Sequence, residues 1–229
     1  MEYRAGIFDL DNTLYNYDSC NDKANQALCE FTCSVMQIGK QQFYDVYQLA
    51  KQNIKSRLGD VAAGHHRLLY FQNFVEQMKF SQLSVAFEMY NIYWDTFLCA
   101  MQLYDGVMEF LKKMKYHEIK IAICTDLTAH IQFRKLEQLK IMDYIDVLVT
   151  SEEVGEEKPS QKMFARTLEK LEIVPGLCFF VGDSLERDIK GAEQMNIKVI
   201  WFRNEKLDVL NYGCDQISDF AELAKKIGI

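Results

Sequence analysis

The sequence has no long apolar segment and no excess of basic residues. No apolar run approaches the roughly 20 residues that a membrane-spanning helix needs. Only a few apolar residues precede Asp9, which is too few for a signal peptide. The net charge is −7, from 33 acidic and 26 basic side chains, whereas nucleic acids and anionic membranes attract positive surfaces. We therefore expect a soluble, cytoplasmic protein that binds neither nucleic acids nor membranes. We also expect it to be a monomer or a homodimer.

The cysteines form no recognisable framework. There are seven, an odd number, and no two are spaced as C-x-x-C. This pattern is typical of thiols in a reducing compartment rather than of disulfides or a zinc site. Cys29 and Cys33 lie one helical turn apart, but no third ligand accompanies them, so we do not expect a metal site there.

Five short apolar runs give the clearest secondary-structure signal. Each is rich in Ile, Val and Phe and nearly continuous, which is typical of strands buried on both faces of a parallel sheet. Helical spacing of apolar residues follows three of the later runs, and a last helix is expected near the end of the sequence. Strands alternating with helices predict an α/β fold, a Rossmann-like sheet with helices on both faces. The expected strands are residues 5–8, 119–124, 145–149, 177–181 and 197–202; the expected helices include residues 131–139, 163–171, 189–195 and 220–227.

Residues 16–103 have a different pattern. They contain no proline and only three glycines, and their apolar residues recur at helical spacing. We expect about four helices packed as a bundle, with the aromatic side chains in its core rather than around a ligand. The sequence thus predicts an α/β core domain of residues 1–15 and 104–229, split by an inserted helical cap of residues 16–103.

Chemically distinctive residues stand at the ends of successive expected strands. The first strand runs into Asp9-Leu10-Asp11-Asn12-Thr13 and the second into Thr125-Asp126. Lys158-Pro159 follows the third strand, and Gly182-Asp183, with Asp188 further on, follows the fourth. In open parallel sheets, the carboxyl ends of the strands meet at the edge where ligands bind. The D-x-D-x-T pattern alone can arise by chance, but four such strand ends in order indicate one site.

This set of side chains suits phosphoryl transfer. Crowded carboxylates favour a hard divalent cation such as Mg²⁺, with Asp9 and Asp183 as the natural ligands. Asp9 can attack phosphorus as a nucleophile, and Asp11 can protonate the leaving alcohol and then activate water. Thr125 and Lys158 offer donors to the phosphoryl oxygens.

Each of these residues also has a plain structural interpretation. Asp9 could cap the turn after its strand, and Thr125 could cap the following helix. Lys158 could be a surface lysine at a helix start. Asp188 could be a solvated helix residue, or it could orient Lys158 or the waters around a metal. The order of all these residues along the chain favours the catalytic interpretation.

Together these motifs resemble the haloacid dehalogenase superfamily. The resemblance covers most of the chain, and the insert after the first motif is similar to the helical cap of phosphoglycolate phosphatases, nucleotidases and acylneuraminate 9-phosphatases. It implies a sheet in the order 5-4-1-2-3, Mg²⁺ dependence and the roles given above. It further implies that Asp11 binds the metal through its carbonyl oxygen rather than its carboxylate.

Two positions refine the resemblance. The dehalogenases lack an acid at the position of Asp11, so its presence favours phosphate chemistry. Many members carry Asn where this chain has Asp126. Because a carboxylate repels a phosphate dianion, we expect Asp126 to point its side chain away and to offer the substrate only its backbone N–H.

We therefore expect a Mg²⁺-dependent phosphatase that hydrolyses a small phosphomonoester through an aspartyl-phosphate. A phosphomutase of the β-phosphoglucomutase kind and a non-catalytic binding protein are the alternatives. The cap should exclude water and select the substrate. Tyr15, Asn16 and Tyr17 are candidates to line the entrance. Cap residues that could reach an anionic group of the substrate, or could simply be exposed at a turn, are Arg57, His65, His66 and Arg67.

Overall fold

The chain divides into two compact units. A computed structural model describes residues 3–203 and 212–229. An α/β unit combines the segment up to Asn16 with Gln102–Ile229, and a helical unit spans Tyr17–Met101. The junctions predicted from the sequence, after residues 15 and 103, differ from these by one and two residues.

The α/β unit is built on one parallel sheet of six strands. The strand order is β3-β2-β1-β4-β5-β6, and every neighbouring pair is parallel. The first five strands confirm the predicted order. The sixth was not predicted, because it has only three residues and two of them are polar. The bounds are Ala5–Phe8 for β1, Lys120–Thr125 for β2, Val147–Thr150 for β3, Cys178–Gly182 for β4, Lys198–Phe202 for β5 and Asp215–Ile217 for β6.

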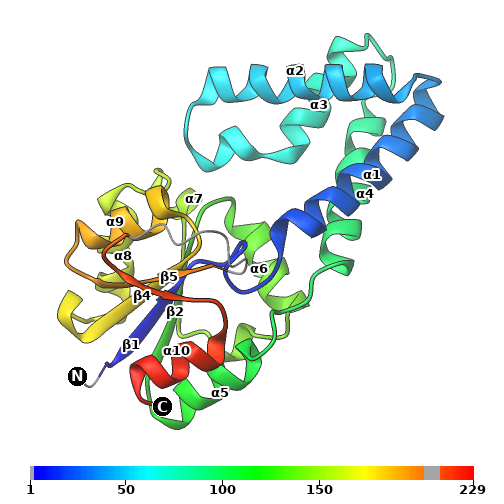
Figure 1. Ribbon diagram of the computed structural model, residues 1–229. Helices are drawn as coiled ribbons and strands as arrows, with labels where there is room; N and C mark the ends of the chain where they lie inside the picture. The colour runs from blue at the N-terminus through cyan, green and yellow to red at the C-terminus, as the bar shows by residue number, and fades with distance from the viewer. Residues whose placement is uncertain (1–2, 204–211) are drawn as a thin grey trace. The chain divides into compact units, whose positions relative to one another are not determined.

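Helices cover both faces of this sheet, as predicted. On one face, Phe110 of α5 contacts both Phe8 of β1 and Phe220 of α10, and α5 and α10 lie side by side in Figure 1. On the other face, Phe164 of α8 contacts Phe180 of β4 within a continuous buried cluster. Alternate side chains of the central strands therefore point to opposite faces and pack into two separate apolar layers. The helices are α5 (Val107–Tyr116), α6 (Ala129–Gln138), α7 (Ser151–Val154), α8 (Gln161–Leu171), α9 (Lys190–Glu193) and α10 (Phe220–Ile227).

Short helical turns complete the unit. They are η2 (Met142–Tyr144), η3 (Pro175–Leu177) and a π-helical turn, η4 (Leu185–Ile189), which leads directly into α9. The helix expected over residues 189–195 is therefore divided between η4 and the short α9.

The helical unit contains the four expected helices. Its elements are α1 (Tyr17–Met36), α2 (Lys40–Leu58), the single turn η1 (Ala62–His65), α3 (Arg67–Gln77) and α4 (Ser84–Cys99). Helix α1 packs on α4, and α2 packs on α3. Aromatic side chains fill the space between the helices, as the sequence predicts, although Tyr44 and Phe87 lie exposed. No helix in the described part of the chain has the length and apolarity required to cross a membrane.

The chain leaves the α/β unit and returns to it through two adjoining backbone segments. Tyr15 and Leu103 form an antiparallel bridge, and the Tyr104 N–H donates to the Leu14 carbonyl oxygen at 2.9 Å. These hydrogen bonds fasten the outgoing and returning segments to each other where the helical unit is inserted.

Packing around β1 predicts the effect of one substitution. A Cβ on Gly6 would lie 2.6 Å from Phe179 Cζ and 2.7 Å from Met114 Cε. We expect Gly6→Ala to lower the free energy of unfolding by about 1–3 kcal/mol, because overpacked interiors must shift. Denaturant titration measures this. The control is Gly176→Ala, whose Cβ would meet nothing within 4 Å; an equal loss in both variants would contradict the packing argument.

Candidate active site

The first motif forms a tight loop that presents Asp9 at the carboxyl end of β1. The Asp9 N–H donates to Val181 O at 2.9 Å, which continues the pairing of β1 with β4. Asn12 adopts a left-handed conformation (φ 62°), and the chain then turns back so that Leu14 N–H donates to Leu10 O. This turn allows the Thr13 hydroxyl to donate to Asp9 Oδ2 at 3.1 Å. The buried Asp9 carboxylate is thereby fixed in orientation.

Lys158 lies between two carboxylates. Its Nζ is 2.5 Å from Asp9 Oδ1 and 2.7 Å from Asp188 Oδ1, and all three side chains are buried. Asp188 also accepts the Ser184 N–H at 3.0 Å. Burial opposes the charged ammonium, but the charges of Asp188 and Asp9 outweigh it and raise the pKa of Lys158 well above its usual value. Lys158 is therefore a fixed cation at the sheet edge, not the surface lysine that its position before proline also allowed.

The carboxylates around Lys158 outnumber the positive charge available to them. Oxygen atoms of Asp9, Asp183 and Asp188 all lie within 4.8 Å of one another. Burial and mutual repulsion raise the pKa of Asp9, despite the attraction of Lys158, and raise the pKa of Asp183 to about 7. A group of three carboxylates, two of them buried, beside one ammonium fits a hard divalent cation such as Mg²⁺, which prefers oxygen ligands.

The grouping differs in detail from the predicted ligand set. Asp9 and Asp183 are in it, and so is Asp188, which sequence reasoning assigned to a supporting role. The Asp11 carboxylate is outside the group. The predicted metal contact of Asp11, through its carbonyl oxygen, remains a prediction.

Gly182 is required where β4 ends. A Cβ at this position would lie 2.5 Å from three atoms of the Asp188 side chain. Only glycine permits the carboxylate of Asp188 to approach the strand so closely and still reach Lys158. The glycine of the fourth motif thus serves the geometry of the aspartate that follows it.

Asp126 uses its side chain to hold the Lys158 loop. Its Oδ1 accepts the Lys158 backbone N–H at 2.9 Å, and its Oδ2 lies 3.3 Å from Arg187 Nη1. These bonds give the carboxylate partners within the protein. Recognition of the substrate by the Asp126 N–H remains a prediction.

Thr125 ends β2 and is fixed by a glutamine that sequence reasoning did not single out. Its buried hydroxyl oxygen accepts the Gln132 Nε2–H at 2.7 Å, and the same amide donates to Asp126 O at 2.6 Å. The Thr125 hydroxyl itself donates to Asp126 O at 3.3 Å. It would have to turn away from this long bond to donate to a phosphoryl oxygen.

Asp11 is bound by two residues that sequence reasoning also failed to place. Lys135 Nζ lies 2.8 Å from Asp11 Oδ1 and 2.7 Å from Oδ2. The Tyr15 hydroxyl donates to Oδ1 at 2.6 Å. The position of Tyr15 at the entrance of the site remains a prediction. The available signal was a pair of polar residues, Gln132 and Lys135, among the apolar positions of an amphipathic helix.

The candidate specificity residues lie in the helical unit. Arg67 Nη2 donates to the Tyr17 hydroxyl at 2.8 Å and its Nη1 to His65 O at 2.9 Å. The guanidinium also lies 5.4 Å from the ring centres of Tyr70 and Tyr93. Arg67 is therefore part of the polar interior of this unit.

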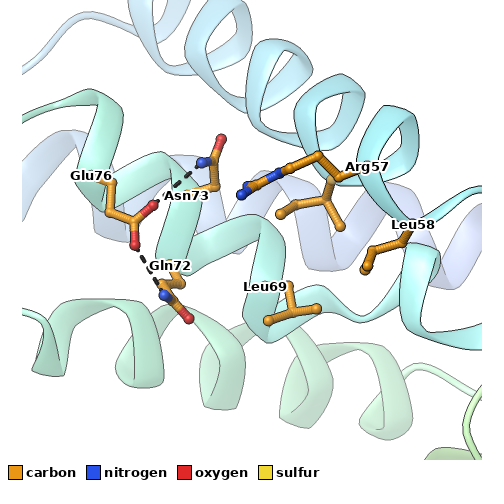
Figure 2. Close-up of a pocket in the computed structure, with 7 residues that line it drawn as sticks. Arg57, Leu58, Leu69, Gln72, Asn73 and Glu76 are labelled. Carbon is orange, nitrogen blue, oxygen red and sulfur yellow. Dashed lines mark hydrogen bonds between the residues drawn. The ribbon is translucent and has the colours of Figure 1, made fainter.

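Arg57 belongs to a different feature of the helical unit. Figure 2 shows it beside a pocket of about 240 Å³ between α2 and α3. Gln72 and Asn73 line the same pocket and both donate to Glu76. All the pocket's lining residues belong to the helical unit, whereas the residues of the four strand-end motifs belong to the α/β unit.

Comparisons with known proteins agree with this architecture. Residues 6–202 match the family described as haloacid dehalogenase-like hydrolase. A ribulose-1,5-bisphosphate 5-phosphatase from Halopiger xanaduensis is 36% identical over 200 residues, which cover 86% of this chain and 84% of the relative. An N-acylneuraminate-9-phosphatase from Mus musculus is 25% identical, covering 86% of this chain and 82% of its own. Among solved structures, the HAD-hydrolase YfnB from Bacillus subtilis, bound to magnesium, has a TM-score of 0.75 at 19% identity, covering both chains fully.

The carboxylate group predicts how metal binding depends on pH. The pKa of Asp183 is about 7 in the folded protein against a usual value of 3.8, so only the folded state keeps this proton between those values. Stability without metal should therefore fall as pH rises through that interval. Mg²⁺ needs the deprotonated carboxylate, so its stabilising effect should grow from pH 6 to pH 8.

Thermal unfolding with and without Mg²⁺ at several pH values measures this difference. In Asp183→Asn the Mg²⁺-induced rise in Tm should be smaller, and its pH dependence should flatten. A rise in Tm that is larger at pH 6 than at pH 8 in the wild type would contradict the assignment of this group as the cation site.

Proposed function

Because the chain belongs to the haloacid dehalogenase-like hydrolase family, we propose that it is a Mg²⁺-dependent phosphatase of small phosphomonoesters, with Asp9 as its nucleophile. The observation that carries this proposal is the contact of Lys158 Nζ with Asp9 and Asp188 among converging strand ends. One ammonium and a surplus of carboxylates suit a phosphoryl group bound together with a divalent cation. Mg²⁺ bound by Asp9, Asp183 and the carbonyl oxygen of Asp11 would neutralise charge on the phosphoryl oxygens.

The first half of the reaction transfers the phosphoryl group to the protein. Asp9 attacks phosphorus, the bond to the leaving oxygen breaks, and an aspartyl-phosphate forms. Lys158 and Thr125 donate to the equatorial oxygens as charge spreads over them. Asp11 gives its proton to the leaving alcohol. The Thr13 hydroxyl, 3.1 Å from Asp9 Oδ2, orients the nucleophile.

The second half returns the protein to its starting state. Asp11, now a carboxylate, takes a proton from a water molecule, and the oxygen of that water attacks the phosphorus on Asp9. The P–O bond to Asp9 breaks and inorganic phosphate leaves. Asp11 is protonated again, so one turnover consumes one water molecule and changes no protein group.

The substrate class follows from the chemistry named for the relatives. The 5-position of ribulose 1,5-bisphosphate and the 9-position of an acylneuraminate are both terminal carbons that carry a primary alcohol. We propose that this chain hydrolyses the phosphate ester of a terminal primary alcohol on a small polyhydroxylated metabolite. The helical unit, with Arg57, His65, His66 and Arg67, would select it. Absence of nucleic-acid and membrane partners, a cytoplasmic location and a monomeric or homodimeric state remain predictions.

A substrate panel with a matched pair of variants tests the proposal. Wild-type protein with Mg²⁺ should release phosphate from terminal phosphate esters of sugars and sugar acids, and chelation should stop it. Asp9→Asn should lower the rate at least about a thousandfold, because it removes the nucleophile. The exposed Asp143 provides the control, since Asp143→Asn makes the same chemical change outside the site.

Two results would contradict the proposal. Full activity in Asp9→Asn would remove the nucleophile assignment. Isomerisation of a hexose 1-phosphate without release of phosphate would identify a phosphomutase.

A further inference from the structure

Helix α6 carries two buried polar side chains on its buried face. Gln132 and Lys135 are both 0% exposed and lie about one helical turn apart, beside the apolar Ile131 and Leu136. Burying an amide and an ammonium costs free energy unless they are paired. Their presence on an otherwise apolar stripe indicates that their partners are the reason for them.

Those partners are Thr125 and Asp11, and both have a role in the proposed mechanism. Gln132 holds Thr125, and Lys135 holds Asp11 with both carboxylate oxygens within 2.8 Å of Nζ. Tyr15 adds a third donor contact to Asp11, at 2.6 Å. The Lys135 Nζ lies 6.0 Å from the centre of the Tyr15 ring, so the ammonium and the tyrosine approach the carboxylate as one group.

The geometry of these contacts restricts the rotation of Asp11. A carboxylate that receives one bond can swing about it, whereas one chelated through both oxygens and held at Oδ1 by a second donor cannot. Tyr15 is tied to the same loop, since residues 11 and 15 form a backbone bridge. The orientation of the Asp11 carboxylate is therefore set by Lys135 and Tyr15, not by the loop alone.

We propose that Lys135 and Tyr15 are positioning residues that aim the carboxyl group of Asp11 at the leaving oxygen of the substrate. This inference rests on the proposed function, in which Asp11 supplies the proton as the Asp9–P bond forms and the bond to the leaving oxygen breaks. Proton transfer requires the donor within hydrogen-bond reach of that oxygen. When Asp11 carries its proton on Oδ2, Lys135 and Tyr15 both still donate to Oδ1, and the proton on Oδ2 faces the leaving oxygen. A misdirected carboxyl group would leave the nucleophile intact and impair the proton transfers of Asp11, of which transfer to the leaving oxygen is the first.

The proposal predicts a dependence on the leaving group that a purely structural role would not produce. An alkoxide is a poor leaving group and requires the proton, whereas p-nitrophenolate leaves as a stable anion without one. Loss of Lys135 or Tyr15 should thus slow transfer from an alkyl phosphate far more than transfer from p-nitrophenyl phosphate.

Single-turnover kinetics with Mg²⁺ isolate this step. The rate of alcohol release is measured for Lys135→Met and Tyr15→Phe with an alkyl phosphate from the panel and with p-nitrophenyl phosphate. On the alkyl phosphate we expect a loss of roughly 100-fold for Lys135→Met and roughly tenfold for Tyr15→Phe. On p-nitrophenyl phosphate both rates should change by less than about threefold.

Two control variants lose similar contacts elsewhere in the α/β unit. Lys170→Met removes an ammonium that is 2.6 Å from Glu153. Tyr212→Phe removes a hydroxyl that donates to Glu193 at 2.7 Å. Both should retain wild-type rates on both substrates. Tyr15→Phe keeps the aromatic ring, so it decides the question if circular dichroism shows that Lys135→Met does not fold.

The outcomes separate this inference from the proposed function. Equal losses on the two substrates, or no loss on either, in a folded Tyr15→Phe would overturn the positioning role while the phosphatase stands. Wild-type protein that releases phosphate from neither substrate nor from any member of the panel would instead contradict the proposed function.

Discussion

The structure at the sheet edge depends on one buried ammonium. Lys158 contacts both Asp9 and Asp188, and each neighbouring feature preserves that contact. Asp126 fixes the backbone from which Lys158 extends, at 2.9 Å, and Gly182 leaves room for Asp188. Without its partners this lysine would be an unpaired buried charge, and without the lysine the carboxylates would repel one another. Parallel strand ends are the means by which these distant segments are brought together.

The two aspartates of the first motif have separate electrostatic supports. Asp9 is paired with Lys158, which the loop after β3 supplies, and Asp11 is paired with Lys135, which α6 supplies. In the proposed mechanism, one lysine accompanies the carboxylate that attacks phosphorus and the other accompanies the carboxylate that transfers the proton. Helix α6 also reaches Thr125 through Gln132, so one helix holds two residues to which we assign phosphate binding and proton transfer.

Much of this arrangement could be predicted, because it follows from periodicity and order. The five apolar runs identified the strands, and the motif residues follow from where those strands end. Strand β6 escaped prediction because Asp215 and Gln216 give it no apolar pattern. Lys135 was not predicted for a related reason. A lysine on a helix is normally expected to be solvent-exposed, and its partner Asp11 lies 124 residues away in sequence. Contacts made across a fold by side chains of ordinary type leave no local signal.

The bridge between Tyr15 and Leu103 joins the two backbone segments at which the helical unit is inserted. Because the outgoing and returning segments are hydrogen-bonded to each other, the 85 residues of Tyr17–Met101 can be lengthened, shortened or exchanged without moving β1 or β2. If this unit selects the substrate, as we propose, evolution can change the substrate while the residues of the α/β unit stay constant. For the same reason, a short turn joining Asn16 to Gln102 would leave a continuous chain with its sheet topology intact.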